Sequence, residues 1–256
     1  MELDKKLNQP LAEYLKHLGD NTLILAQRLS EWCGHGPVLE EDLAITNVAL
    51  DLIGQTRLWL GLAADIDDTG GDADSLAYQR DVLDFRNALL VELPNGDFAT
   101  TAARQFLFDH WQLLALAELS RSSLQPLADI AAKSHKEVRY HTDRSDQWVR
   151  ILGDGTPVSR ERFETALNAL WSYTGELFEV KQGDQALIDA GIITDMSLLH
   201  RQWRDDITSV LDQASLATPP DEYMQRGGRD GMHSEHLGYL LAEMQFLQRA
   251  YPGAEW

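Results

Sequence analysis

The sequence predicts an all-α protein, built as a bundle of helices in one domain. Apolar residues recur at three- and four-residue spacing through most of its 256 residues, and runs with a period of two are hard to find. Breaker segments rich in glycine, proline or asparagine separate the periodic stretches. Two stretches, residues 39–63 and 98–119, are apolar in nearly every direction, which is typical of a helix in the middle of a bundle.

Eight helices are expected between these breakers. They cover residues 11–33, 40–66, 75–92, 98–122, 127–152, 159–181, 195–216 and 233–250. The turn Pro94-Asn95-Gly96-Asp97 precedes the fourth helix, and Asp97 is placed to cap it. Ser159 is the expected start of the sixth helix, after the breaker at 153–157. Because no repeat and no long linker occurs, we expect a single domain over residues 1–256.

Composition excludes several classes of protein. Hydrophobic residues make up 44% of the chain and charged residues 25%, which is ordinary for a globular protein. The formal net charge of -19 argues against a nucleic-acid partner, because phosphate binding needs a positive face. No run of about 18 apolar residues is present, so no membrane span is predicted. The first six residues lack the apolar core of a signal peptide.

The single cysteine, Cys33, lies between Trp32 and Gly34 at the expected end of the first helix. One cysteine cannot form an internal disulfide, so we expect a reducing, cytoplasmic location. One residue also supplies no partner base, and we therefore expect a buried structural thiol rather than a nucleophile.

Polar residues on the apolar helices are the most informative feature for function. The stripes are Asp20, Gln27 and Glu31 on the first helix; Asn47, Asp51 and Gln55 on the second; Gln105, Asp109 and Gln112 on the fourth; and Lys133, Glu137, Tyr140, His141 and Arg144 on the fifth. Residues four apart share a helix face. If these faces converge, carboxylates meet inside the bundle, where a charge is costly unless it is paired or bound to metal.

The order of the acidic residues matches that of a di-iron carboxylate bundle, which takes a Glu from each of two helices and Glu-x-x-His from each of two others. Glu31 (or Gln27) and Asp109 stand at the single-carboxylate positions, and Asp51-x-x-Gly54 and Glu137-x-x-Tyr140 stand at the two motifs. Neither motif has its histidine, and carboxylates alone are unusual for non-haem iron. We therefore expect vestigial ligand positions at Glu31, Asp51, Asp109 and Glu137, with no metal, cofactor or catalytic residue in this chain.

Two alternatives to a lost site stay open. His141 follows Glu137 by four residues and so shares its face, which makes His141 an alternative ligand. The same residues could instead neutralise one another, because Lys133–Glu137 and Glu137–His141 are both spaced by four. Polar networks of this kind can hold a bundle in one register.

The run His233-Ser234-Glu235-His236 resembles a metal or catalytic cluster in composition. It follows a glycine-rich loop and begins the last expected helix, where Ser234 and Glu235 suit capping and first-turn positions. We expect structural use of this run. The preceding loop, residues 227–231, is no phosphate loop, because it lacks the lysine and a preceding strand.

Several uncommon runs, spread in order over nearly the whole chain, carry a family resemblance. They are Leu18-Gly19-Asp20-Asn21, Arg28-Leu29-Ser30-Glu31-Trp32-Cys33-Gly34-His35, Leu50-Asp51-Leu52-Ile53-Gly54-Gln55, Leu93-Pro94-Asn95-Gly96-Asp97-Phe98-Ala99, Lys136-Glu137-Val138-Arg139-Tyr140-His141, His233-Ser234-Glu235-His236-Leu237-Gly238 and Leu241-Ala242-Glu243-Met244-Gln245. Through them the chain resembles the C subunits of bacterial 1,2-phenylacetyl-CoA epoxidases, also called phenylacetate-CoA oxygenases.

This resemblance implies a ferritin-like helical bundle with additional C-terminal helices. It also implies a place in aerobic phenylacetate catabolism, where an oxygenase complex uses O2 and NADPH to form a ring epoxide on phenylacetyl-CoA. In that complex the di-iron site belongs to a homologous catalytic A subunit, which works with accessory subunits and a reductase. The C subunit is regarded as structural, and no catalytic or metal residue is carried over to this chain.

Three hypotheses follow. The first is a non-catalytic subunit that supports a di-iron partner through a large, apolar interface. The second is a divergent metal-dependent oxidoreductase that uses Glu31, Asp109, Glu137 and His141. The third is a helical scaffold or storage-like protein without a catalytic partner. A homo-oligomer is the assembly expected of this chain when it is alone.

Overall fold

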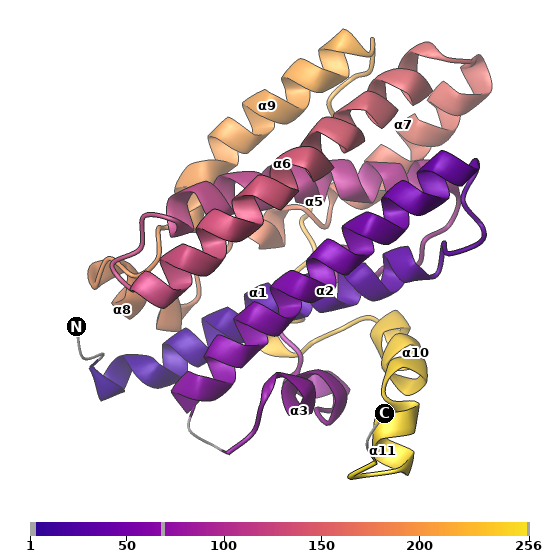
Figure 1. Cartoon of the computed structure of the whole chain (residues 1–256). Coiled ribbons are helices and arrows are strands. Elements are labelled where there is room, and N and C mark those ends of the chain that lie inside the picture. The colour runs from indigo at the N-terminus through magenta and orange to yellow at the C-terminus, as the bar shows by residue number, and fades with distance from the viewer. Residues whose placement is uncertain (1–3, 68–69, 255–256) are drawn as a thin grey trace. The chain divides into compact units, whose positions relative to one another are not determined.

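The computed structural model describes residues 4–67 and 70–254, and these are all-α with no strand among them. Figure 1 shows the helices. Their bounds are α1 Asn8–Ser30, α2 Leu39–Asp67, α3 Ala73–Tyr78, α4 Leu89–Glu92, α5 Phe98–Leu119, α6 Gln125–Asp154, α7 Pro157–Trp171, α8 Gln182–Asp189, α9 His200–Gln213, α10 Glu235–Met244 and α11 Phe246–Ala250. Short 3-10 turns lie at Lys5–Leu7, Val82–Asp84, Gly175–Phe178, Met196–Leu199 and Gly228–Asp230. The all-α prediction is confirmed.

The chain divides into two compact units. The first comprises Met1–Pro94 and Gly227–Trp256, and the second comprises Asn95–Arg226. The C-terminal helices α10 and α11 therefore belong with the N-terminal helices, although about 130 residues separate them in sequence. The expectation of one domain over residues 1–256 stays a prediction.

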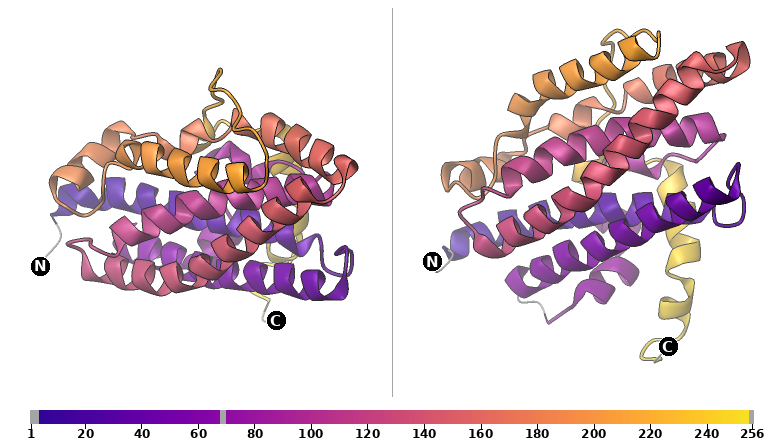
Figure 2. Two further views of the ribbon diagram at one scale, coloured as in Figure 1. Left: turned by 90° about the horizontal axis from the view of Figure 1, so that it is seen from above. Right: turned by 45° about the horizontal axis from the view of Figure 1, so that its top comes forward.

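In the first unit, α1 and α2 lie side by side along most of their lengths (Figures 1 and 2). Gly19 makes their close approach possible, since a Cβ at this position would lie 2.5 Å from a methyl carbon of Leu60. The hydroxyl groups of Thr22 and Thr56 are 2.8 Å apart and join the two helices by a hydrogen bond. Apolar side chains fill the rest of this contact, with Leu15 and Trp59 among the most buried.

In the second unit, α5 packs against α6, α7 and α9. Trp203 of α9 is fully buried, and its indole Nε1 donates a hydrogen bond of 3.1 Å to the carbonyl of Leu107 on α5. The imidazole Nε2 of His110 on α5 lies 2.8 Å from a carboxylate oxygen of Asp146 on α6. These contacts hold the central helix of the unit in place from two sides.

Helix caps confirm part of the predicted boundaries and correct another part. The carboxylate of Asp97 accepts a hydrogen bond of 3.0 Å from the Thr100 N–H, so Asp97 caps α5 as predicted. The cap of α7 is Thr156 rather than Ser159, with Pro157 in the first turn and Ser159 closing a capping box. The Thr-Pro pair at 156–157 is therefore the stronger start signal, one turn before the predicted one.

The predicted helix at 75–92 is wrong, because residues 79–88 do not continue α3 into α4. Side chains of α1 take the backbone donors that a helix would use. The Arg86 N–H donates to Asp20 Oδ2 at 2.8 Å, and the Ala88 N–H donates to Asn21 Oδ1 at 2.8 Å. Periodicity within 75–92 cannot reveal these long-range partners.

Smaller differences occur elsewhere. The predicted helix at 159–181 ends at Trp171, α8 lies in a stretch predicted as loop, and the final helix is broken at Gln245. The Gln245 amide donates to the carbonyls of Ala77 and Arg80, each at 3.0 Å, which ties the break to the α3 region.

Cys33 is exposed, which corrects the expectation of a buried thiol. No described helix is long and apolar enough to cross a membrane.

The outer side of α2 also differs from expectation. The sequence predicts a helix in the middle of a bundle here, yet Leu43 and Leu50 are more than half exposed. The opposite side, which includes Leu52 and Trp59, is buried. Apolar residues therefore occur on both sides of α2, but this chain buries only one of these sides.

Candidate functional site

Asp109, the acidic residue predicted at a single-carboxylate position of the fourth helix, is buried on α5 of the second unit, with 1% of its surface exposed. Its Oδ1 accepts a hydrogen bond of 3.1 Å from the amide of Gln105, one turn earlier. Its Oδ2 is buried, and an interaction with the Ser145 side chain favours the charged form of the carboxyl. Burial raises the pKa of Asp109 from 3.8 to about 6, and the charge of His141 opposes this rise.

The neighbouring helix α6 brings His141 into the surroundings of Asp109. His141 is fully buried, and its charge acts on the Asp109 carboxyl. The hydroxyl of Thr142 donates to the Val138 carbonyl of its own helix at 2.9 Å and lies 3.5 Å from the Asp109 carbonyl, so α5 and α6 are in direct contact here. Glu137 is half-buried, one turn before His141. The structure thus brings together two of the predicted positions, Asp109 and the alternative ligand His141.

One rule of helix register accounts for both incomplete motifs. On α6 the third residue after Glu137 is Tyr140, which is 55% exposed, whereas the fourth is the buried His141. On α2 the third residue after Asp51 is the exposed Gly54, whereas the fourth is Gln55, which is 1% exposed. A histidine at 54 or 140 would therefore point away from the interior. The buried position after each acid is the fourth, where α6 has an imidazole and α2 has an amide.

Glu31 is not among the buried carboxylates. It directly follows the last residue of α1 and is exposed, and its carboxylate pairs with Arg28 at 2.8 Å. Because the Glu31 carboxylate stays open to solvent, its pair with the buried Arg28 contributes little to stability. The buried acid on α1 is instead Asp20, which belongs to the same predicted stripe as Glu31.

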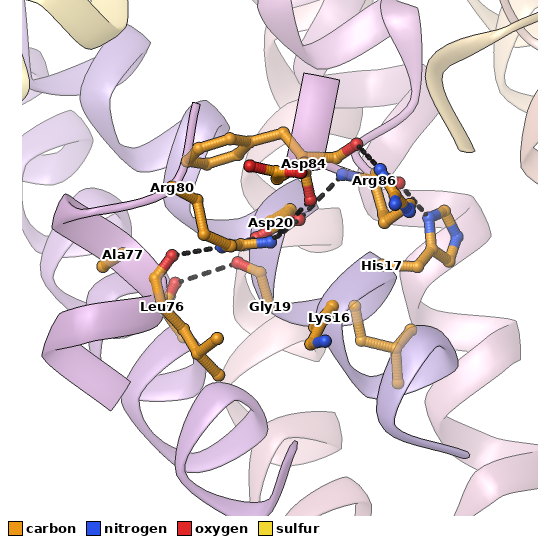
Figure 3. Close-up of polar contacts among 12 residues, drawn as sticks. Lys16, His17, Gly19, Asp20, Leu76, Ala77, Arg80, Asp84 and Arg86 are labelled. Atoms are coloured by element: carbon orange, nitrogen blue, oxygen red, sulfur yellow. Dashed lines mark hydrogen bonds and ion pairs between the residues drawn. The ribbon is translucent and has the colours of Figure 1, made fainter. Parts of the chain in front are cut away.

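Asp20 is neutralised within the first unit, as Figure 3 shows. It is fully buried, and the guanidinium of Arg80 donates to both of its oxygens, with Nη1 3.0 Å from Oδ2. The Arg86 N–H donates to the same Oδ2 at 2.8 Å. The ring of Phe85 lies 4.3 Å from the Arg80 guanidinium carbon and shields the pair. Asp20 is therefore a structural link between α1 and the segment that follows α3.

A second buried carboxylate, Glu92 on α4, was missed by the sequence reasoning. Its Oε2 lies 2.8 Å from His233 Nδ1 and accepts a hydrogen bond of 2.9 Å from the Asn87 amide. Its Oε1 accepts a hydrogen bond of 2.6 Å from the Ser234 N–H at the start of α10. The signal that could have found it is a lone charge in the apolar run 89–93.

The run His233-Ser234-Glu235-His236 therefore has a structural role at its first two residues. His233 Nε2 lies 3.1 Å from the Phe85 carbonyl, so both ring nitrogens of His233 face oxygen atoms. Ser234 occupies the cap position of α10, but it contributes its backbone N–H rather than its hydroxyl. The prediction of structural use is confirmed for His233 and Ser234.

The donor set does not fit a di-iron centre. Within residues 4–67 and 70–254, no group of three or more His, Cys, Asp or Glu residues is arranged to hold a metal ion. Glu31 is exposed and paired with Arg28, and α2 supplies no nitrogen ligand near Asp51. A pair of irons needs several carboxylates and two imidazoles around one point. Asp109 and His141 supply one of each.

Comparisons with known proteins agree with the resemblance. The family model described as Phenylacetic acid catabolic protein matches residues 2–256. The chain belongs to this family. It is also similar to the C subunit of 1,2-phenylacetyl-CoA epoxidase from Escherichia coli (strain K12), with 46% identity over 250 residues, which are 98% of this chain and 100% of that protein. The resemblance predicted from the sequence is confirmed, and so is the ferritin-like helical fold class that the family shares.

Proposed function

We propose that the chain is the non-catalytic structural subunit of a phenylacetyl-CoA ring 1,2-epoxidase in aerobic phenylacetate catabolism. It binds a homologous catalytic chain that holds the di-iron site, alongside accessory subunits and a reductase that delivers electrons from NADPH. The E. coli relative is by its name a subunit of such an enzyme, and it is similar to this chain over its whole length. The assembly works in the cytoplasm.

The observation that carries the non-catalytic role is the register of α2. Its buried position after Asp51 holds Gln55, whose amide cannot replace an imidazole as an iron ligand, and the exposed position holds Gly54. One of the two nitrogen ligands is therefore absent from the helix that should provide it. Polar groups of the chain itself, rather than a metal, satisfy the buried acids Asp20 and Glu92.

The test measures iron and turnover in matched preparations. The chain is produced alone, and together with the homologous di-iron subunit, in iron-supplemented culture. Iron per chain is determined by mass spectrometry. Epoxide formation from phenylacetyl-CoA is followed with NADPH, O2 and the reductase. We expect a stable complex, with iron and turnover that depend on the partner. About two irons per chain and turnover by this chain alone would overturn the proposal.

The second candidate is a metal-dependent oxidoreductase, for which the buried Asp109 beside His141 is the favouring observation. His141→Ala separates the two candidates. A resident metal site predicts loss of the bound metal, whereas the structural role predicts a lower melting temperature with the iron content of the complex unchanged.

A further inference from the structure

The outer side of α2 carries an exposed apolar stripe. Three leucines on this side are exposed: Leu39 at 70%, Leu43 at 56% and Leu50 at 59%. At 100° per residue, six residues of α2 point within about 40° of one direction. These six define the outer stripe: Leu39, Leu43, Leu50, Gly54, Arg57 and Gly61. It runs for about 33 Å at 1.5 Å per residue, long enough for a second helix to lie along it.

Two glycines in the outer stripe have no explanation within their own unit. A Cβ at Gly54 or at Gly61 would meet no atom within 4 Å. A glycine in the middle of a helix makes that helix less stable than an alanine would. At a position with open space around it, alanine would therefore be the more stable choice. A glycine does allow the backbone of a neighbouring helix to come close. Both glycines lie on the same side of α2 as Leu43 and Leu50. The leucines make the stripe apolar, and the glycines leave room on it for a close neighbour.

Charges at the two ends of the stripe argue against a second copy of this chain as the neighbour. Glu40 is exposed at the N-terminal end of α2, and Asp65 is exposed at the C-terminal end. Parallel or antiparallel pairing of two α2 helices would place acid next to acid at both ends, which is unfavourable. The net charge of -19 on each copy adds to this repulsion.

Arg57 sets a second condition on the helix that docks on the outer stripe. It is exposed within the stripe, close to Gly54 and Gly61, and its charge would be covered by any helix that docks there. A covered guanidinium needs a carboxylate partner. The neighbour that fits therefore has an apolar middle, basic residues at both ends and one acid opposite Arg57.

We propose that the outer stripe of α2 is the docking surface for a helix of a different subunit, with an apolar middle, basic ends and a carboxylate that faces Arg57. This proposal rests on the proposed function, because it names the face through which this chain binds its catalytic partner. Two glycines on the stripe set a close helix–helix distance, and the leucines fill the contact.

The test uses full-length chains and the homologous di-iron subunit as the binding partner. Leu50→Glu places a charge in the stripe, and Ile151→Glu is its control on α6, where Ile151 is 55% exposed. Gly54→Leu fills the open position. Binding is measured by surface plasmon resonance and by size-exclusion chromatography with light scattering, and the melting temperature of each free chain is recorded.

We expect Leu50→Glu and Gly54→Leu to weaken the complex at least tenfold, while Ile151→Glu binds as the parent does. Gly54→Leu should also raise the melting temperature of the free chain, because it removes a helical glycine at an open site. Such opposite signs exclude misfolding as the cause of weak binding. Unchanged binding by both stripe variants would overturn the docking surface and leave the proposed function standing. Failure of the parent chain to bind would overturn both, and a dimer of this chain that the stripe variants abolish would identify a second copy as the occupant.

Discussion

The buried Glu92 gives the sharpest prediction about what holds the C-terminal helices to the first unit. The perturbation is Glu92→Ala, which removes a carboxylate that is fully buried. Three donors then lose their acceptor at once: the Ser234 N–H at 2.6 Å, the Asn87 amide at 2.9 Å and His233 Nδ1 at 2.8 Å. The site is closed to solvent, since the His233 side chain is 1% exposed. Water is therefore kept from replacing the carboxylate.

The magnitude follows from the penalty for unpaired buried groups. Each buried donor that loses its acceptor costs about 1–3 kcal/mol, so we take about 3–5 kcal/mol for the three donors together. In a chain of this size, each kcal/mol lowers the melting temperature by roughly 2–4 °C. We therefore expect Glu92→Ala to lower it by about 6–20 °C. Glu92→Gln should cost clearly less, because its carbonyl still accepts from Ser234 and the Asn87 amide can turn to accept.

The assay is urea unfolding followed by circular dichroism, together with amide hydrogen exchange. Exchange should accelerate in α10 and around residues 85–92 before it changes in α5 and α6 of the second unit. Glu235→Ala is the control, because Glu235 is exposed and one residue from Ser234. A decrease of less than about 1 kcal/mol in the free energy of unfolding of Glu92→Ala would contradict this prediction, because three unsatisfied buried donors should cost more than that. So would equal costs for Glu92→Ala and Glu235→Ala.

Three further predictions concern single positions. Burial raises the pKa of Asp109 from 3.8 to about 6. Between about pH 4 and pH 6, the Asp109 carboxyl is therefore protonated in the folded chain and ionised in the unfolded chain. The buried charge then costs about 3 kcal/mol above pH 6 and nothing below about pH 4, so Asp109→Asn should be more stable than the parent at about pH 8 and equal at about pH 4 in urea unfolding. Gly228→Ala places a Cβ 2.1 Å from the Asn87 carbonyl oxygen and should cost about 1–3 kcal/mol by thermal unfolding, and an unchanged melting temperature would contradict the close approach. Cys33 is exposed, so one thiol per chain should react with Ellman's reagent without denaturant, and a reaction seen only in urea would show that it is covered.

Elements whose signals lie inside the helix itself could be predicted from the sequence. The Asp97 cap and the long periodic runs of α1, α2, α5 and α6 are of this kind, and the boundaries of these helices fell within about three residues. The segment 79–88 could not be predicted, because its conformation depends on Asp20 and Asn21, more than 60 residues away. The same holds for Glu92, whose partner His233 is 141 residues away in sequence.

The candidate site shows where spacing alone is too coarse. Positions three and four after an acid both lie near its helix face, so the sequence permits either as the inward residue. Packing decides between them, and it turns His141 inward and Tyr140 outward on α6. On α2 the same choice buries Gln55 and exposes Gly54. The proposed absence of nitrogen ligands is therefore best judged at the fourth position, where α6 has an imidazole and α2 has an amide.

The apolar pattern of α2 shows a different limit. A helix that is apolar all round predicts burial on every side, but periodicity cannot tell whether the cover comes from the same chain or from another. In this chain Leu52 and Trp59 are covered, whereas Leu43 and Leu50 are not. A subunit that works only in an assembly needs both sets, because the first stabilises its own fold and the second becomes buried on docking. The overprediction of burial on α2 is thus itself an argument for the partner that the outer stripe is proposed to bind.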